Sequence, residues 1–244
     1  MRFLRTSLQQ VIRVTVAAWL SSTIAGCQSS PLESDAAPAQ MSSCSAALRQ
    51  ALGLVDAASE SEVSVLEGEQ GSELVVFVDA SAGGINGQDA YPWVYVSLAS
   101  GTPVGLTDIE ALASDDWDLA FKRFVVRTNS GDGGPGKGGA LRVELPWKSV
   151  TLDTLGTRSL PAEDWFDDDC NLTIDEQGEL VTTFAGWHEY DLATHTLMPA
   201  PVVYLVRGAA GALYKLAILD YYASPSSGPG TVPGRYKLRI APLK

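Results

Sequence analysis

From Glu62 to the C-terminus, the chain alternates short apolar runs with glycine, proline, aspartate, asparagine and serine. Runs of this kind, rich in valine, leucine, tyrosine and tryptophan, are typical of strands bounded by turns. Within Trp93–Leu98, side chains alternate between two faces, as in a strand with one face toward a core. We find no βαβ alternation and no repeat, and therefore predict an all-β, mostly antiparallel single domain. The predicted strands are residues 74–78, 93–98, 119–121, 124–127, 141–145, 181–185, 202–207, 213–219 and 236–240.

A short N-terminal helix is expected before the first strand. Apolar residues recur at helical spacing within Ser43–Ala58, which predicts one amphipathic helix there. Hydrophobic residues make up 45% of the chain, enough to bury a core, and this excludes a disordered protein. We expect the folded β domain to span residues 44–244.

The first 26 residues have the pattern of a signal peptide. Arg2, Arg5 and Arg13 precede the apolar run Val14–Gly26, and this run is shorter than the roughly 20 residues that span a bilayer. The run ends in Ile-Ala-Gly followed by Cys27, which resembles the cleavage box of bacterial lipoproteins. We expect Cys27 to be lipidated; the alternative is a plain signal peptide with an incidental cysteine.

Residues 27–43 are rich in serine, proline, alanine and acidic residues, which is typical of a flexible tether. Several acyl chains on one cysteine give stable membrane anchoring, because each buried methylene contributes about 0.8 kcal/mol. Gln28 stands where an aspartate would favour inner-membrane retention. We therefore expect a lipid-anchored protein of the outer membrane, on its periplasmic or cell-surface face.

The charge balance limits the possible partners. The formal net charge is −12, whereas binding to nucleic acid requires clustered lysine and arginine, so nucleic acid is excluded as a partner. His188 and His195 are the only two histidines in the sequence. This excludes a His-rich metal cluster and the H-E-x-x-H motif of zinc proteases.

Cys44 and Cys170 remain once Cys27 is assigned to the lipid. An exported compartment permits a disulfide, and we expect these two cysteines to form one. The alternative is two unpaired thiols. If formed, the bond closes a long loop and stabilises the fold by about 4–5 kcal/mol in the chain-entropy model.

The glycine-rich segment Gly131–Gly139 imitates a phosphate loop. Gly138 replaces the serine or threonine that would bind magnesium, and a strand rather than a helix is predicted after it. We therefore interpret the segment as a long turn whose glycines allow close backbone approach.

The acidic segment 167–178 resembles the oxygen-ligand spacing of a calcium loop. Leu172 occupies the position of the sharp-turn glycine, and Gly178 occupies that of the bidentate glutamate. A solvated acidic loop is the interpretation that we favour.

Both histidines lie in one predicted hairpin. If Asp191–Thr194 is the turn, Tyr190 pairs with His195, and His188 shares a face with them. Both imidazoles would then approach a metal from one side, whereas two axial ligands of a haem iron lie on opposite faces of the ring. Either the hairpin supplies one axial ligand and another loop supplies the second, or the turn is longer than Asp191–Thr194. Two solvent-facing histidines with no ligand role remain an equal alternative.

Several segments together resemble the signature of the HmuY family of bacterial surface haem-binding lipoproteins. The resemblance covers roughly residues 90–222. It is carried by Asp116–Arg123, Val126–Gly131, Gly138–Ala140, Gly186–Trp187 and Val203–Gly211.

The resemblance implies a mostly antiparallel β domain that captures haem between two loops and hands it to an outer-membrane receptor, here a TonB-dependent one. In the family, one histidine ligand precedes the Gly-Trp pair and another follows it. Here residues 148–185 contain no histidine, and Leu192 stands five residues after Trp187. His188, His195 and Met198 are nearby substitutes, and Tyr190 is a further candidate; imidazole and thioether both ligate haem iron.

The resulting hypothesis is non-catalytic haem capture for iron acquisition. The alternative is a binding lipoprotein that kept the fold, lost haem ligation and binds another ligand or a protein. A hydrolase is a third possibility, but no G-x-S-x-G elbow precedes a helix and nothing specifies a catalytic triad. We therefore do not expect an enzyme.

Overall fold

The computed structural model describes residues 44–176, 178, 180–226 and 230–244. The expected signal peptide and tether, with Cys27, lie outside the described residues. Within the described part, no helix is both long and apolar enough to cross a bilayer. The helices are α1 (Ser45–Ala51), α2 (Gly84–Gly87) and α3 (Asp108–Ala111), with 3-10 turns at Gln88–Ala90, Gly131–Gly133, Trp147–Ser149 and Leu152–Thr154.

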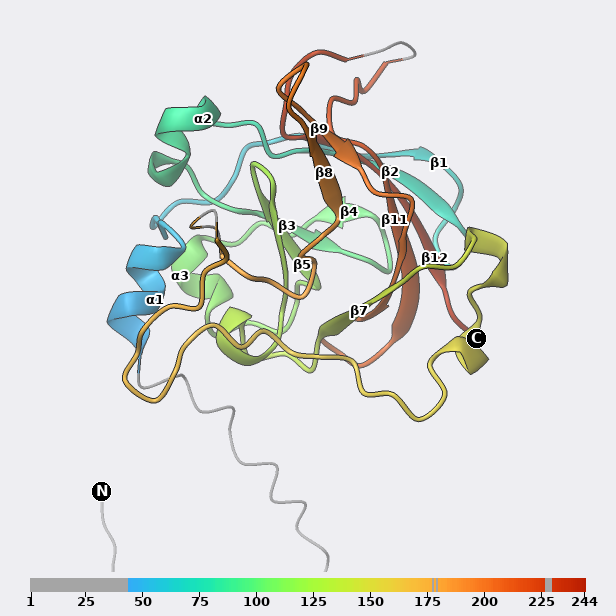
Figure 1. The fold of residues 1–244 in the computed structure, drawn as a ribbon, viewed down its shortest axis with the longest axis horizontal. Helices are drawn as coiled ribbons and strands as arrows, with labels where there is room; N and C mark the ends of the chain where they lie inside the picture. Colours follow the sequence, from blue (N-terminus) through green and yellow to red (C-terminus); the bar gives the residue numbers. More distant parts are fainter. Residues whose placement is uncertain (1–43, 177, 179, 227–229) are drawn as a thin grey trace, which may run out of the picture. The chain divides into compact units, whose positions relative to one another are not determined.

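Antiparallel strands dominate the described residues, and they form two main sheets (Figure 1). The larger sheet has the order β1-β2-β12-β11-β10-β7, the smaller has the order β4-β3-β5-β6, and β8 and β9 form a separate hairpin. The predicted all-β, mostly antiparallel fold is confirmed. The strands are β1 (Val63–Glu67), β2 (Leu74–Asp79), β3 (Val94–Ser97), β4 (Thr102–Pro103), β5 (Leu119–Lys122), β6 (Val125–Thr128), β7 (Gly139–Val143), β8 (His188–Asp191), β9 (Thr196–Pro199), β10 (Val203–Arg207), β11 (Leu213–Asp220) and β12 (Arg235–Pro242).

The main core joins the two larger sheets. One buried cluster contains aliphatic side chains of β2, β11 and β12 together with those of β3 and β5. The rings of Phe121 in β5 and Tyr236 in β12 meet edge-on, with centroids 5.2 Å apart. Burial of this apolar surface is the main stabilising contribution to the pairing of the sheets.

The opposite face of the smaller sheet carries a second core. Tyr95 of β3 and Trp93, just before that strand, pack there with Leu48 and Leu52 from the α1 region, whereas Val94 and Val96 face the main core. The alternation predicted for Trp93–Leu98 is thus observed. A third cluster, which includes Val143, Val150 and Leu205, covers part of the outer face of the larger sheet.

The predicted short N-terminal helix is present, but it is shorter than Ser43–Ala58. It ends at Ala51, and Gly53, with φ 53°, takes a left-handed conformation that terminates it. Residues 181–185 were predicted as a strand but form a turn, in which the N–H of Ala185 donates to the carbonyl of Thr182. The short strands β1 and β4 were not predicted.

The signature segments of the sequence turn out to be structural. Trp117 is fully buried and donates its indole N–H to the carbonyl of Ala111. The Asn129 side chain donates to the carbonyls of Ser114 and Trp117 and accepts from the N–H of Gly136. The glycine-rich turn therefore wraps around a buried asparagine, as the long-turn interpretation requires.

Glycine is needed where this turn touches the asparagine. A Cβ added to Gly138 would lie 2.5 Å from the carbonyl oxygen of Asn129. At Gly134 it would lie 2.3 Å from the side-chain oxygen of the same residue. These distances are shorter than van der Waals contact, so only glycine fits at both positions.

Candidate functional site on the β8–β9 hairpin

The hairpin β8–β9 carries every residue predicted to ligate iron, and it is attached to the domain at several points (Figure 1). The N–H of Leu197 donates to the hydroxyl of Tyr222, and the N–H of Ala200 donates to the carbonyl of Trp187. The indole of Trp187 donates to the carbonyl of Phe124. These bonds fix the base of the hairpin against the β5–β6 turn and the end of β11.

The observed register differs from the predicted one. Tyr190 pairs with Leu197, and His188 pairs with Pro199, so the pairing is shifted by two residues and the turn runs from Leu192 to His195. The predicted pairing of Tyr190 with His195 was wrong. The cause is Asp191, whose carboxylate accepts from the N–H groups of Ala193 and Thr194 and so closes a turn beyond it.

The register assigns the candidate ligands to faces. His188 and Tyr190 share one face with Leu197 and Pro199, because directly paired residues project to the same side of a sheet. Met198 pairs with Glu189 and therefore projects from the opposite face. The structure thus separates Met198 from His188 and does not bring the three predicted ligands together.

His188 lies half-buried between aromatic rings. Its ring centroid is 4.5 Å from that of Trp187 and 6.3 Å from that of Phe124. Burial lowers the pKa of His188, and nearby Asp175 opposes this shift, so the neutral imidazole is favoured. Its Nδ1 atom is buried without a hydrogen-bond partner among the described residues. A buried polar atom left unpaired in this way is costly and marks a candidate functional residue.

His195 is exposed at the end of the turn. Its Nδ1 lies 2.9 Å from the hydroxyl oxygen of Tyr190, and it has a φ of 54°. The hydrogen bond connects His195 to the tyrosine that shares a face with His188. The hairpin thus joins Tyr190 to His195, whereas His188 lies in the strand pair farthest from the turn, so the two imidazoles do not lie side by side as the predicted register implied.

Large apolar side chains are unusually exposed around the hairpin. Half of the exposed large hydrophobic residues found in the described part lie between residues 174 and 198. Leu192 is 79% exposed and Met198 57% exposed. Exposed large apolar side chains on the hairpin and on the loop before it are candidates for contact with a ligand. The members are Ile174, Val181, Tyr190, Leu192 and Met198.

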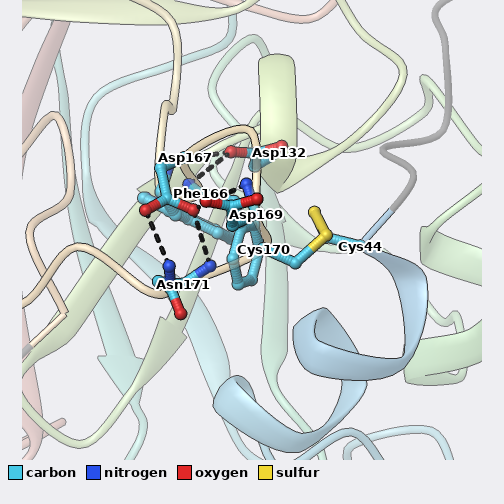
Figure 2. The surroundings of a disulfide bond; sticks show 8 residues. Cys44, Asp132, Phe166, Asp167, Asp169, Cys170 and Asn171 are labelled. Atoms are coloured by element: carbon cyan, nitrogen blue, oxygen red, sulfur yellow. Dashed lines mark hydrogen bonds between the residues drawn. A yellow bond between two sulfur atoms is a disulfide. The ribbon is translucent and has the colours of Figure 1, made fainter.

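The loop that leads to the hairpin is joined covalently to the start of α1. Cys170 forms a disulfide with Cys44, with the Cα atoms 5.3 Å apart (Figure 2). The expected bond is therefore present in the structure. It closes a loop with a sequence separation of 126 residues.

The acidic loop uses its carboxylates on its own backbone. Asp167 accepts from the N–H groups of Asp169 and Asn171 and from the side-chain amide of Asn171 (Figure 2). These bonds lower the pKa of Asp167. Across the part of the chain that the structure describes, no group of three or more metal-binding side chains is found. Both observations agree with the solvated acidic loop that we favoured over a calcium site.

Sequence reasoning missed a set of buried charged residues beside the second core. Arg127 is fully buried between Trp93 and Trp117, at 4.6 and 4.7 Å from their ring centroids. Asp108, also fully buried, accepts from the hydroxyl of Tyr95 and from the N–H of Trp93. Hydrophobic periodicity assigns charged residues such as Arg127 and Asp108 to the surface. The tryptophans near them in the sequence were the only indication that they are buried.

A second buried acid, Glu163, lies under the glycine-rich turn. Its two oxygens accept from the hydroxyl and N–H of both Thr128 and Thr183 and from the indole of Trp165. Burial raises the pKa of Glu163, opposed by these hydrogen bonds. Because both oxygens accept hydrogen bonds from donors of the fold, we assign this carboxylate to structure rather than catalysis.

The sheets and the hairpin define an all-β, mostly antiparallel domain whose candidate ligands lie on one projecting hairpin. The family profile described as HmuY protein matches residues 89–236, more than half of the chain. The chain therefore belongs to the HmuY family, as its sequence predicted. A search of curated proteins finds no similar sequence.

Solved structures similar to this chain come from related bacterial proteins. A candidate lipoprotein of Bacteroides fragilis has 18% identity and a TM-score of 0.43, over 72% of this chain and 93% of its own. A candidate HmuY-like haem-binding protein of Bacteroides vulgatus has 16% identity and a TM-score of 0.44, over 71% and 94%. The apo HmuY analog of Tannerella forsythia has 15% identity and a TM-score of 0.43, over 77% and 98%.

Proposed function

We propose that this protein is a lipid-anchored lipoprotein of the outer membrane that captures haem without catalysis, for iron acquisition. Cys27 carries the lipid, and a TonB-dependent receptor of the same membrane accepts the haem. Membership of the HmuY family supports the ligand, and the N-terminal sequence supports the anchor.

The observation that carries this proposal is the hairpin β8–β9. It combines two imidazoles with an exposed phenol and exposed aliphatic side chains. Haem is a flat, apolar macrocycle with an iron that accepts imidazole nitrogen, so it requires both kinds of group. The residues of the hairpin therefore fit haem as a cargo.

The three candidate ligands fit iron unequally. His188 offers a neutral imidazole, but its Nδ1 is enclosed by the fold. His195 is exposed and bonded to Tyr190. Met198 projects from the other face of the hairpin, so it serves as a ligand only if haem binds on that side.

A haemin titration of the full chain in detergent, against an empty-micelle reference, tests the proposal. We expect a shifted, saturable Soret band with one haem per chain. At least one of His188→Ala and His195→Ala should alter the spectrum of the complex, while Met198→Leu should not. A titration that only reproduces haemin in micelles would reject haem capture.

One observation favours a second function. Residues 148–185 contain neither histidine nor methionine, so the loop in which the family carries a ligand offers none here. A protein of this fold that lost haem ligation would bind another ligand or a protein partner. That function predicts no Soret shift in the haemin titration, together with recovery of a partner when the protein is pulled down from an outer-membrane extract without haem.

A further inference from the structure

The hydrogen bond between Tyr190 and His195 engages Nδ1 of the imidazole, so Nε2 is the nitrogen that can face a metal. Tyr190 Oη occupies Nδ1 of His195 at 2.9 Å. When the proton is on Nδ1, this nitrogen donates to the tyrosine oxygen and Nε2 keeps its lone pair. Ligating histidines generally bind the metal through one nitrogen while the other makes a hydrogen bond that fixes the ring. The exposed imidazole therefore has the arrangement of a metal ligand whose orientation is already set.

The turn supports the same arrangement. His195 has a φ of 54°, in the left-handed region that costs a non-glycine residue free energy. The Asp191 carboxylate accepts two N–H groups of the turn, and the hydroxyls of Thr194 and Thr196 lie 2.7 Å apart. These bonds hold the turn in shape and offset the strain at His195.

The other two candidates lie at the end of the hairpin away from the turn that carries His195, because His188 pairs with Pro199 and Met198 pairs with Glu189. His188 belongs to the same face of the hairpin as Tyr190, and Met198 belongs to the other face of the same two strands. Two trans ligands must approach the iron from opposite sides of the macrocycle. Residues 148–185 supply no imidazole or thioether to close over it.

We infer that haem is held from one side only, by Nε2 of His195, with Tyr190 as the residue that orients this imidazole. The inference rests on the proposed haem capture and adds how the iron is held. The second axial position of the iron is then left to water or another small ligand. Exposed Leu192 contributes apolar surface beside the same turn.

The spectrum of the ferric complex of the full chain tests this directly. We expect the high-spin spectrum of iron with one imidazole ligand, and conversion to a low-spin spectrum when cyanide or free imidazole fills the open position. A low-spin, bis-ligated spectrum before any addition would overturn the inference, although haem capture would stand. A titration with no saturable binding would reject haem capture and the inference with it.

Two variants distinguish a loss of iron ligation from a loss of folding. His195→Asn keeps a residue that tolerates positive φ and should lose the imidazole-bound spectrum, which free imidazole should restore. Tyr190→Phe keeps the ring and should weaken haem binding about 10–100-fold, while the exposed Tyr91 serves as the control through Tyr91→Phe. Unchanged spectra for His195→Asn, or equal affinities for Tyr190→Phe and Tyr91→Phe, would contradict the assignment.

Discussion

At the scale of single residues, the family signature describes packing rather than haem chemistry. Trp117 and Asn129 are buried and bonded within the fold, and Asp118 accepts from the N–H groups of Leu98 and Ala209. The signature therefore predicted the fold well. It contained no information on whether the hairpin histidines approach a ligand.

Gly138→Ala should destabilise the protein by about 1–3 kcal/mol, because the new Cβ meets the carbonyl of Asn129 in a packed turn. Gly105→Ala is the matched control, since its Cβ would meet nothing within 4 Å. Urea denaturation measures both. Equal stabilities of the two variants would show that the turn does not pack tightly on Asn129.

Glu163→Gln should lower the free energy of unfolding by about 2–3 kcal/mol near neutral pH. The amide NH₂ of glutamine would face donors that the carboxylate now accepts from, including the N–H of Thr183 and the indole of Trp165. The exposed Glu176 provides a control through Glu176→Gln. Chemical denaturation of both variants is the measurement, and a loss no larger than that of the control would refute the structural role.

The stability difference between wild type and Glu163→Gln should depend on pH. The pKa of Glu163 is raised by burial, so the folded protein binds a proton at higher pH than the unfolded chain does. Its contribution to stability therefore increases as pH falls from the raised pKa toward the usual value of 4.5. The stability difference between wild type and Glu163→Gln should widen over this range, and a difference independent of pH would contradict the shift.

At the scale of elements, long strands were predictable and short or capped ones were not. The apolar segments of β2, β3, β10, β11 and β12 carry enough residues to show their period. The two residues of β4 carry none, and the register of β8–β9 depends on the carboxylate of Asp191 accepting turn N–H groups. That these residues share one hairpin was therefore predicted, whereas their pairing was not.

The disulfide belongs to this scale because it joins α1 to the loop before the hairpin. Replacing both Cys44 and Cys170 by serine should lower the free energy of unfolding by up to about 4–5 kcal/mol, since the bond constrains a long loop of the unfolded chain. Thermal unfolding with and without reductant measures this. Reductant should destabilise wild type and leave the double variant unchanged; no effect of reductant on wild type would mean that the bond is not formed.

At the scale of the whole molecule, the packed β domain is distinct from the hairpin β8–β9, which carries the candidate ligands at its surface. The two cores and the buried charges Asp108, Arg127 and Glu163 hold the sheets. The exposed side chains around the hairpin take no part in these cores.

Membrane attachment is also a property of the whole molecule. Cys27→Ser should move the protein from the membrane fraction to the soluble fraction, because a lipid on that residue provides the proposed anchor. Fractionation followed by immunoblotting measures the distribution. Membrane association that survives the substitution would mean that another segment or partner holds the protein.

Stoichiometric capture of haem by the hairpin is the central claim. A comparison of the haem retained by wild type and by a variant without both imidazoles tests it most directly. Haemin is offered to equal amounts of wild type and the variant His188→Ala/His195→Asn, and the haem retained by each full chain is measured after gel filtration. We predict about one haem per wild-type chain and none above the micelle background for the variant. Equal retention of haem by the two proteins would mean that residues other than the hairpin histidines bind it, and would contradict the claim.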